Sequence, residues 1–249
     1  GTDENIDQEH TVLKNINMGL VCGIIIAPVQ EKDAVTAEFL RDYVENGIPV
    51  ILLDRDLFHI KLDAVLSNDV DGACEVVKCL IDEGHTKIGF IAGPETSRPG
   101  AKRLEGYLKA LHESGISVAD EYIANGMFRE EGGYEAMKTL MELQDPPTAV
   151  FSSNNLSTLG CLKYVKEQNL KIGRDVSLVS FDRIRELEYV KHGLTSVDRP
   201  IYQMGYTAME LVQKRLHDGE KFGTESYMPN RFTVDTFLVR HGSEKLCRD

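Results

Sequence analysis

The sequence predicts an α/β protein whose sheets consist mainly of parallel strands. Short apolar runs of strand length alternate along the chain with longer stretches in which apolar residues recur at helical spacing. Most of the short runs are continuous and rich in Ile, Val and Phe, which is typical of strands that are covered on both faces. Regular strand–helix–strand alternation favours parallel pairing. A chain of 249 residues is long enough for one large domain or for two lobes with separate cores.

The individual elements follow from this alternation. Gly, Pro or Asp punctuates the strand-length runs, which is usual where strands end. The predicted strands cover 22–28, 49–54, 87–93, 122–128, 148–153, 176–182 and 234–239. Several of the helical stretches end at a Gly, a common helix stop. The predicted helices cover 35–46, 71–83, 101–114, 131–143, 157–169 and 201–216.

Composition argues against several classes of protein. The formal net charge of -12 should repel phosphate backbones, so we do not expect this chain to contact nucleic acid directly. The longest uncharged apolar run, 18–29, is too short to cross a bilayer, and the acidic residues 1–10 do not resemble a signal peptide. The cysteines show no CxxC spacing, which favours reduced thiols in a cytoplasmic protein over disulfides or a metal site. They are Cys22, Cys74, Cys79, Cys161 and Cys247.

Polar side chains follow four of the predicted strands at the point where each strand ends. Asn154 follows 148–153, Asp182 ends 176–182, and Asp54 ends 49–54, while a polar loop follows 87–93. Asn and Asp also suit turns and helix caps, so any one of them alone would be unremarkable. Ligands of open parallel sheets bind outside the carboxyl ends of the strands. Four such ends together therefore predict a binding crevice.

Seven blocks of the sequence resemble the effector-binding domain of LacI-type bacterial transcriptional regulators. In order along the chain they are 48–57 (IPVILLDRDL), 65–94, 103–111 (RLEGYLKAL), 129–137, 146–165, 175–182 (DVSLVSFD) and 194–212. The resemblance extends from about Asn5 to the last predicted strand. It implies a periplasmic-binding-protein-like fold of type I, in which two flavodoxin-like lobes are joined by three crossovers and a small molecule binds in the cleft.

The resemblance also implies a division of the chain into lobes. Residues 1–93 and 200–223 would form the N-terminal lobe, and residues 94–199 and 224–249 the C-terminal lobe. The family's helix-turn-helix and hinge are absent, as are the first strand, helix and second strand of the N-terminal lobe. Residues 1–10 look like the acidic loop after that second strand. A central sheet edge would then be unpaired, unless the missing strands are supplied in another way.

The resemblance implies seven ligand contacts, and five of them have a structural alternative. They are Asp54, Arg55, Arg103, Phe128, Asn154, Asp182 and Arg199. Carboxylates accept hydrogen bonds from sugar hydroxyls, Arg donates through a planar fork, and an aromatic ring stacks on a sugar. Alternatively, Asp54 and Arg55 form a surface ion pair, Arg103 lies on a solvated helix face, Phe128 is core, and Asn154 caps the following helix.

The charge of the effector is open at this stage. The three Arg residues of the set could place cations around the cleft, and many family members carry Gln where this chain has Arg199. Because Arg suits phosphate and carboxylate, the cations would favour a sugar phosphate or a sugar acid. In the opposite interpretation, Asp54, Asp182 and Asp198 neutralise them.

The resemblance implies the effector-sensing and dimerisation domain of a cytoplasmic repressor. The domain would form a homodimer, bind a carbohydrate, and reach operator DNA only through a headpiece that this chain lacks. The alternative is a solute-binding protein for sugar uptake or chemotaxis, because the fold is shared. An enzyme is not expected, since no GxSxG elbow, P-loop or GxGxxG after a strand is present, and we expect no cofactor and no metal.

Overall fold

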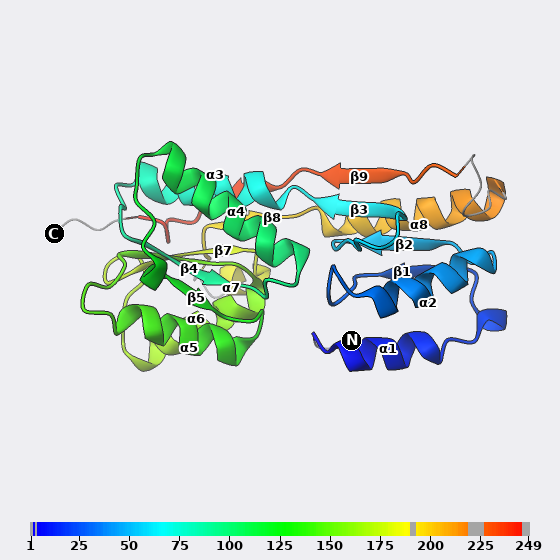
Figure 1. The fold of residues 1–249 in the computed structure, drawn as a ribbon. Coiled ribbons are helices and arrows are strands. Elements are labelled where there is room, and N and C mark those ends of the chain that lie inside the picture. Colours follow the sequence, from blue (N-terminus) through cyan, green and yellow to red (C-terminus); the bar gives the residue numbers. More distant parts are fainter. Residues whose placement is uncertain (1, 3, 190–192, 219–226, 246–249) are drawn as a thin grey trace. The chain divides into compact units, whose positions relative to one another are not determined.

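The computed structural model describes residues 2, 4–189, 193–218 and 227–245 (Figure 1). The chain forms two compact units. The first comprises Gly1–Ser67, Thr96–Arg98 and Pro200–Val234, and the second comprises Asn68–Glu95, Pro99–Arg199 and Asp235–Asp249. Apart from the short segment Thr96–Arg98, the chain passes between the units three times, as the sequence predicted. No helix in the described part of the chain is long and apolar enough to cross a membrane.

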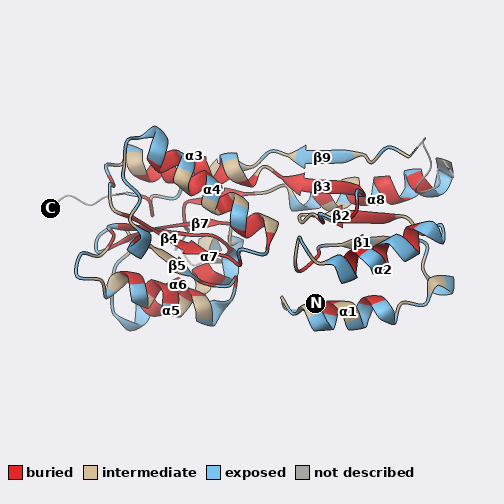
Figure 2. Ribbon diagram, viewed as in Figure 1, coloured by how far each residue is buried: buried red, intermediate tan, exposed pale blue. Residues whose placement is uncertain are grey.

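The first unit contains a parallel sheet with helices on both faces. Its strands lie in the order β1 (Ile24–Ile26), β2 (Val50–Leu53), β3 (Asp63–Ser67) and β9 (Arg231–Val234). One face packs on α1 (Ile6–Lys14) and α2 (Ala34–Glu45), and the other on α8 (Ile201–Asp218) (Figure 1). Successive residues of β2 point to opposite faces, so Leu52 packs in the α2 core and Ile51 in the α8 core. The edge strand β9 is mostly exposed (Figure 2).

The start of the chain differs from the sequence-based expectation of a loop. Helix α1 begins at Ile6, because the side chain of Asn5 accepts hydrogen bonds from the backbone N–H groups of Asp7 and Gln8. The buried carboxylate of Glu9 accepts from Val29 N at 2.8 Å and from Thr36 Oγ1 at 2.7 Å. These bonds tie α1 to the loop after β1 and to α2. Within the described residues, β1 pairs with β2 alone, so it is an edge strand.

The second unit is built on a larger sheet. The strand order is β10 (Phe237–Val239), β8 (Ser196–Asp198), β7 (Ser177–Phe181), β6 (Ala149–Ser152), β4 (Ile88–Ala92) and β5 (Ile123–Asn125), with only β10 antiparallel. One face packs on α3 (Asp69–Asp82) and α4 (Arg98–Glu113). The other face packs on α5 (Glu130–Met141) and α6 (Asn155–Glu167) (Figure 1). A short helix, α7 (Arg185–Tyr189), follows β7.

Two features of the sheets were not anticipated from sequence. The predicted strand 234–239 contains the last residue of β9, which pairs with β3 in the first unit, and all of β10, which pairs with β8 in the second. Strands β3 and β8 were not predicted at all. Both begin and end in polar residues, so their apolar signal is weak.

The division into units also differs from the expected lobes. Residues 68–93, which the sequence assigned to the first lobe, belong to the second unit. The reason is that β4 pairs with β5 and β6, and α3 packs against β7, β8 and β10. The expected boundary between residues 223 and 224 lies outside the described residues, but residues 227–234, which were expected in the second lobe, belong to the first unit because β9 pairs with β3.

A buried ion pair joins helix α8 to the sheet of the first unit. Arg215 donates through Nε and Nη2 to the two carboxylate oxygens of Asp63 at 2.7 and 2.8 Å, and Nη2 also donates to Met228 O. The two side chains are 5% and 1% exposed. Asp63 also accepts from Asn230 N at 2.6 Å, so one carboxylate fixes α8, β3 and the chain that leads into β9.

We expect Arg215→Ala to destabilise the protein strongly, because it leaves the buried Asp63 carboxylate without its cation. Losing one partner of a buried pair typically costs about 3–5 kcal/mol. Urea unfolding followed by circular dichroism measures this free energy. The neighbouring exposed residue gives the control, Lys214→Ala, which should change it by less than about 0.5 kcal/mol. Equal effects of the two substitutions would contradict the structural role of the pair.

A buried histidine makes the stability of the second unit depend on pH. The ring of His85 is buried and lies 2.8 Å from Thr148 Oγ1 and 3.1 Å from the carbonyl oxygen of Glu244. Because a carbonyl can only accept, Nε2 carries the proton. Burial lowers the pKa of His85 below its usual value of about 6.5.

We expect the free energy of unfolding to fall as the pH is lowered below about 6.5. The unfolded state then binds a proton that the folded state resists, so the contribution of His85 is present above that pH and is lost as the pH falls through the folded-state pKa. Urea unfolding between pH 7 and pH 5 measures it. His85→Gln should make the free energy of unfolding depend less on pH, whereas the control His112→Gln, at an exposed site, should leave the dependence unchanged. The same dependence on pH in the unaltered protein and in both variants would refute the role of His85.

Candidate functional site

Three of the predicted ligand residues follow adjacent strands of the six-stranded sheet. Asn154, Asp182 and Arg199 come just after β6, β7 and β8, which are parallel neighbours. Phe128 follows β5, and Arg103 belongs to α4. Five of the seven predicted residues therefore lie in the second unit, and the structure brings them into direct contact with one another.

The carboxylate of Asp182 lies between two guanidinium groups. Its Oδ1 accepts from Nε and Nη2 of Arg199, each at 2.7 Å. Its Oδ2 lies 3.6 Å from Nη1 of Arg103. The side chains of Asp182 and Arg199 are 15% and 13% exposed, so their contact is only partly screened by solvent.

Arg103 is buried, which excludes the solvated helix face considered from sequence. Its side chain donates to Asp69 Oδ1 at 3.0 Å and to Ser153 O at 2.7 Å. Its guanidinium lies 3.8 Å from the centre of the Phe181 ring. Gly106, one turn further along α4, allows this position, because a Cβ there would lie 2.3 Å from the carbonyl oxygen of Val70 in α3.

Phe128 and Asn154 contact each other. The ring of Phe128 is buried against Gly93, where a Cβ would come within 2.1 Å of it, and lies 5.7 Å from the Arg103 guanidinium. Asn154 caps α6 by accepting from Ser157 N at 2.9 Å, and its amide donates to Phe128 O at 3.4 Å. The structural role foreseen for Asn154 is therefore present, and its role toward a ligand stays a prediction.

Three of the predicted residues share an uncommon backbone conformation. Asp54, Phe128 and Asp182 have φ values of 66°, 56° and 70°, in the left-handed region. Asp tolerates this region better than most residues, whereas a bulky aromatic residue rarely adopts it. Such residues persist where the surrounding structure holds them, and they cluster at functional sites. Three of the six non-glycine residues with positive φ in the described chain are thus predicted ligand residues; the others are Glu4, Met127 and Asn169.

Asp54 and Arg55 lie in the first unit, after β2. Asp54 is 3.4 Å from Ser67 Oγ. Arg55 donates to both carboxylate oxygens of Glu4, at 2.5 and 2.9 Å, and to the carbonyl oxygens of Pro28 and Val29. Arg55 is therefore joined to Glu4, rather than to Asp54, in the ion pair that the structure shows.

Sequence reasoning missed Asp69, Arg183 and Glu188, which complete the cluster in the second unit, whereas it named Asp198 as a possible neutralising charge. Asp69, at the start of α3, is fully buried and holds Arg103. Asp198 Oδ2 lies 3.3 Å from Nη1 of Arg183, whose Nε and Nη2 donate to Glu188. Hydrogen bonds from Arg183 lower the pKa of the Glu188 carboxyl. A sequence signal was available, since the dipeptide Asp-Arg recurs after three strands, at 54–55, 182–183 and 198–199.

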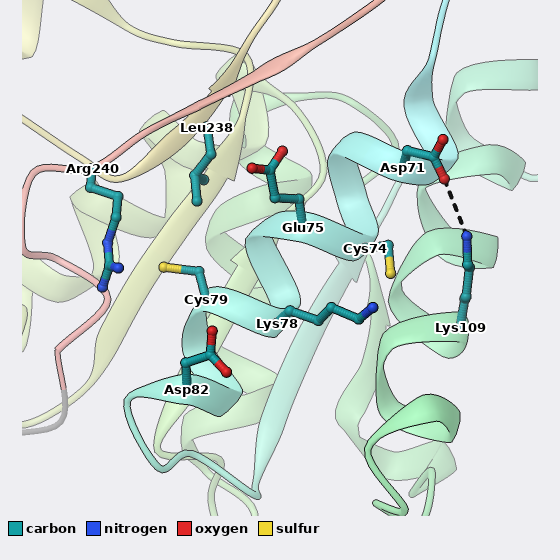
Figure 3. Close-up of a pocket in the computed structure, with 9 residues that line it drawn as sticks. All are labelled: Asp71, Cys74, Glu75, Lys78, Cys79, Asp82, Lys109, Leu238 and Arg240. Carbon is teal, nitrogen blue, oxygen red and sulfur yellow. Dashed lines mark hydrogen bonds and ion pairs between the residues drawn. The ribbon is translucent and has the colours of Figure 1, made fainter.

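A separate groove of about 460 Å³ lies on the second unit, away from the predicted residues. Both acidic and basic side chains line it, including the ion pair of Asp71 and Lys109 at 3.2 Å (Figure 3). Burial raises the pKa of the Cys79 thiol to about 11, so this thiol is protonated at neutral pH. None of the seven predicted ligand residues lines the groove.

The described cysteines and acidic residues do not form a metal site. The described cysteines are free thiols; Cys74, Cys79 and Cys161 are buried, and Cys22 is exposed. Cys247 lies outside the described residues. In the part of the chain that the structure describes, no group of three or more His, Cys, Asp or Glu side chains could hold a metal ion.

The chain is similar to known regulators of transcription. Residues 77–234 match the family described as periplasmic binding protein-like domains. The HTH-type transcriptional repressor CytR of Escherichia coli is 34% identical over 200 residues, which are 80% of this chain and 57% of CytR. Catabolite control protein A of Priestia megaterium is 32% identical over 240 residues, covering 96% of this chain and 67% of that protein. The chain thus spans roughly three fifths to two thirds of the length of these relatives.

Solved structures show the same relationship. A putative ribose operon repressor from Burkholderia thailandensis superposes with a TM-score of 0.81 at 27% identity, over 96% of this chain and 84% of that one. A putative transcriptional regulator LacI from Bacillus cereus gives a TM-score of 0.79 at 27% identity, over 92% and 78% of the two chains. These matches confirm the fold that the sequence predicted: the chain belongs to the periplasmic-binding-protein-like domains of the LacI family of transcriptional regulators.

Proposed function

We propose that this chain is the effector-sensing domain of a bacterial transcriptional repressor and that it binds a small sugar or sugar derivative. The observation that carries the proposal is the position of Asp182 between Arg103 and Arg199, at the carboxyl ends of β7 and β8. In open parallel sheets this edge is where ligands bind. The relatives named as repressors, and the structural neighbour named a putative ribose operon repressor, support the same function rather than an enzyme.

The chemistry of these residues suits a polyhydroxylated ligand. A carboxylate accepts hydrogen bonds at several lone pairs, so Asp182 can accept from a sugar hydroxyl while it also holds Arg199. Guanidinium groups donate to hydroxyl oxygens, and the face of an aromatic ring such as Phe128 is suited to the C–H groups of a sugar ring. Asn154 would add an amide next to that ring.

Regulation requires the effector to prefer one conformation of the protein. A ligand that binds two conformations equally shifts neither, however tightly it binds. The domain would work in the cytoplasm as a homodimer, and the conformational change would pass to a separate DNA-binding headpiece. The net charge of -12 is consistent with this division of labour, because the sensing domain itself would repel DNA.

We expect a carbohydrate to stabilise the protein against heat. A ligand present at 100 times its dissociation constant adds about 2.7 kcal/mol, which raises Tm by several degrees in a protein of this size. A thermal-shift screen of pentoses, hexoses, disaccharides, sugar phosphates and sugar acids measures this. Asp182→Ala should abolish the shift.

The matched control is Asp175→Ala, which removes an exposed aspartate at the opposite end of the same strand. This variant should keep the full shift. A panel in which no carbohydrate raises the Tm of the unaltered protein would contradict the proposed ligand class, and a shift that survives in Asp182→Ala would contradict the proposed site.

We expect the protein to be a dimer in solution at micromolar concentration. Light scattering coupled to size-exclusion chromatography should give twice the mass of one chain. The mass should not depend on the effector, because sensing is proposed to change conformation rather than assembly. A monomer mass over the whole concentration range would contradict the dimer.

A further inference from the structure

Two Asp-Arg dipeptides stand side by side at the ends of β7 and β8. In this parallel pair Phe181 lies opposite Val197, so Asp182–Arg183 and Asp198–Arg199 follow at the same level of the sheet. Asp182 accepts from Arg199 at 2.7 Å, and Asp198 lies 3.3 Å from Arg183. Each aspartate is thus paired with the arginine of the other dipeptide. The two ion pairs cross between the strands and fix both strand ends.

The second arginine beside Asp182 is also compensated. Arg103 donates to Asp69 at 3.0 Å, and the side chains of these two residues are 2% and 0% exposed. Asp69, Arg103, Asp182 and Arg199 therefore form a chain of ion pairs, in which each arginine contacts at least one aspartate. Arg55, in the first unit, is likewise bound by a carboxylate, that of Glu4.

This pairing favours the interpretation in which carboxylates neutralise the arginines over the one in which the arginines bind an anionic effector. An anionic ligand that binds Arg199 or Arg103 must compete with a carboxylate already in place, and it brings a further negative charge close to Asp182 and Asp69. Like charges at a desolvated interface are strongly unfavourable. A hydroxyl group instead donates to a carboxylate oxygen and accepts from a guanidinium without adding charge.

We propose that the effector is an uncharged polyhydroxylated molecule, and that Arg199 is a positioning residue that holds Asp182 for it. The inference rests on the proposed function, because it concerns the same effector site. Arg199 contacts Asp182 with two N–H groups and thereby keeps its carboxylate oriented while its backbone is in the left-handed region. Arg199 sets specificity through Asp182 and does not anchor an anion.

The test is titration calorimetry with matched neutral and anionic probes. The pairs are D-ribose with D-ribose 5-phosphate, D-glucose with D-glucose 6-phosphate, and D-galactose with D-galacturonate. For the pair that binds, the unaltered protein should prefer the neutral member by at least about tenfold in Kd. Asp182→Asn removes one negative charge and should move this preference by about tenfold or more toward the anion. Arg199→Gln should weaken binding of the neutral member and move the preference the opposite way.

The two variants should shift the preference between neutral and anionic probes in opposite directions. A general loss of folding would instead weaken the binding of both probes alike. Circular dichroism and Tm without ligand check the fold of each variant. Matched controls come from the exposed neighbouring pair, Asp175→Asn and Arg174→Gln, and should leave the preference unchanged.

The outcomes distinguish the two proposals. Tighter binding of an anionic member by the unaltered protein would overturn the neutral effector while leaving the sensor function in place. A preference that does not move in Asp182→Asn would also overturn it. If neither member of any pair, nor any other carbohydrate, binds, the proposed function fails and this inference fails with it.

Discussion

The contact of the Asp182 carboxylate with Arg199 and Arg103 is the interaction on which the rest of the site depends. Partly buried charges are tolerated only when they are paired, because removing one partner leaves the other desolvated and uncompensated. Asp182 therefore constrains Arg199, Arg103 constrains Asp69, and these contacts connect β7, β8, α3 and α4 within the second unit. These charged side chains are therefore held in position before any ligand binds at the strand ends.

Local geometry makes this arrangement possible. Glycines at positions 93 and 106 leave room where the Phe128 ring and the backbone of α3 approach, so aromatic rings and the Arg103 guanidinium can come close. The left-handed backbone at Asp182 directly follows the end of β7, and that at Phe128 lies in the turn between β5 and α5. Strain of this kind is held by its surroundings, and at a binding site it contributes preorganisation.

The fold alone does not separate a repressor from a solute-binding protein, because both use this architecture. The proposal of a repressor domain rests instead on the relatives, which at 32–34% identity match most of this chain and include a protein named as a transcriptional repressor. The formal net charge of -12 is consistent with the proposed effector-sensing role, because such a charge repels DNA.

The sequence by itself determined the fold class, the positions of most strands and helices, and the residues at the strand ends. These follow from apolar periodicity and punctuation, which are local signals. Elements with weak apolar signals, such as β3, β8, α1 and α7, were missed for the same reason. The change from one sheet to the other between Val234 and Phe237 has no local signal either.

Only the tertiary structure decided how the charges pair. The partners lie far apart in the sequence: Arg103 is 34 residues from Asp69, Arg199 is 17 from Asp182, and Arg215 is 152 from Asp63. A count of arginines and aspartates could not tell an anion-binding cluster from a neutral one, because the answer depends on which carboxylate each guanidinium reaches. Burial and strand register, which place those groups within hydrogen-bonding distance, exist only in the folded chain.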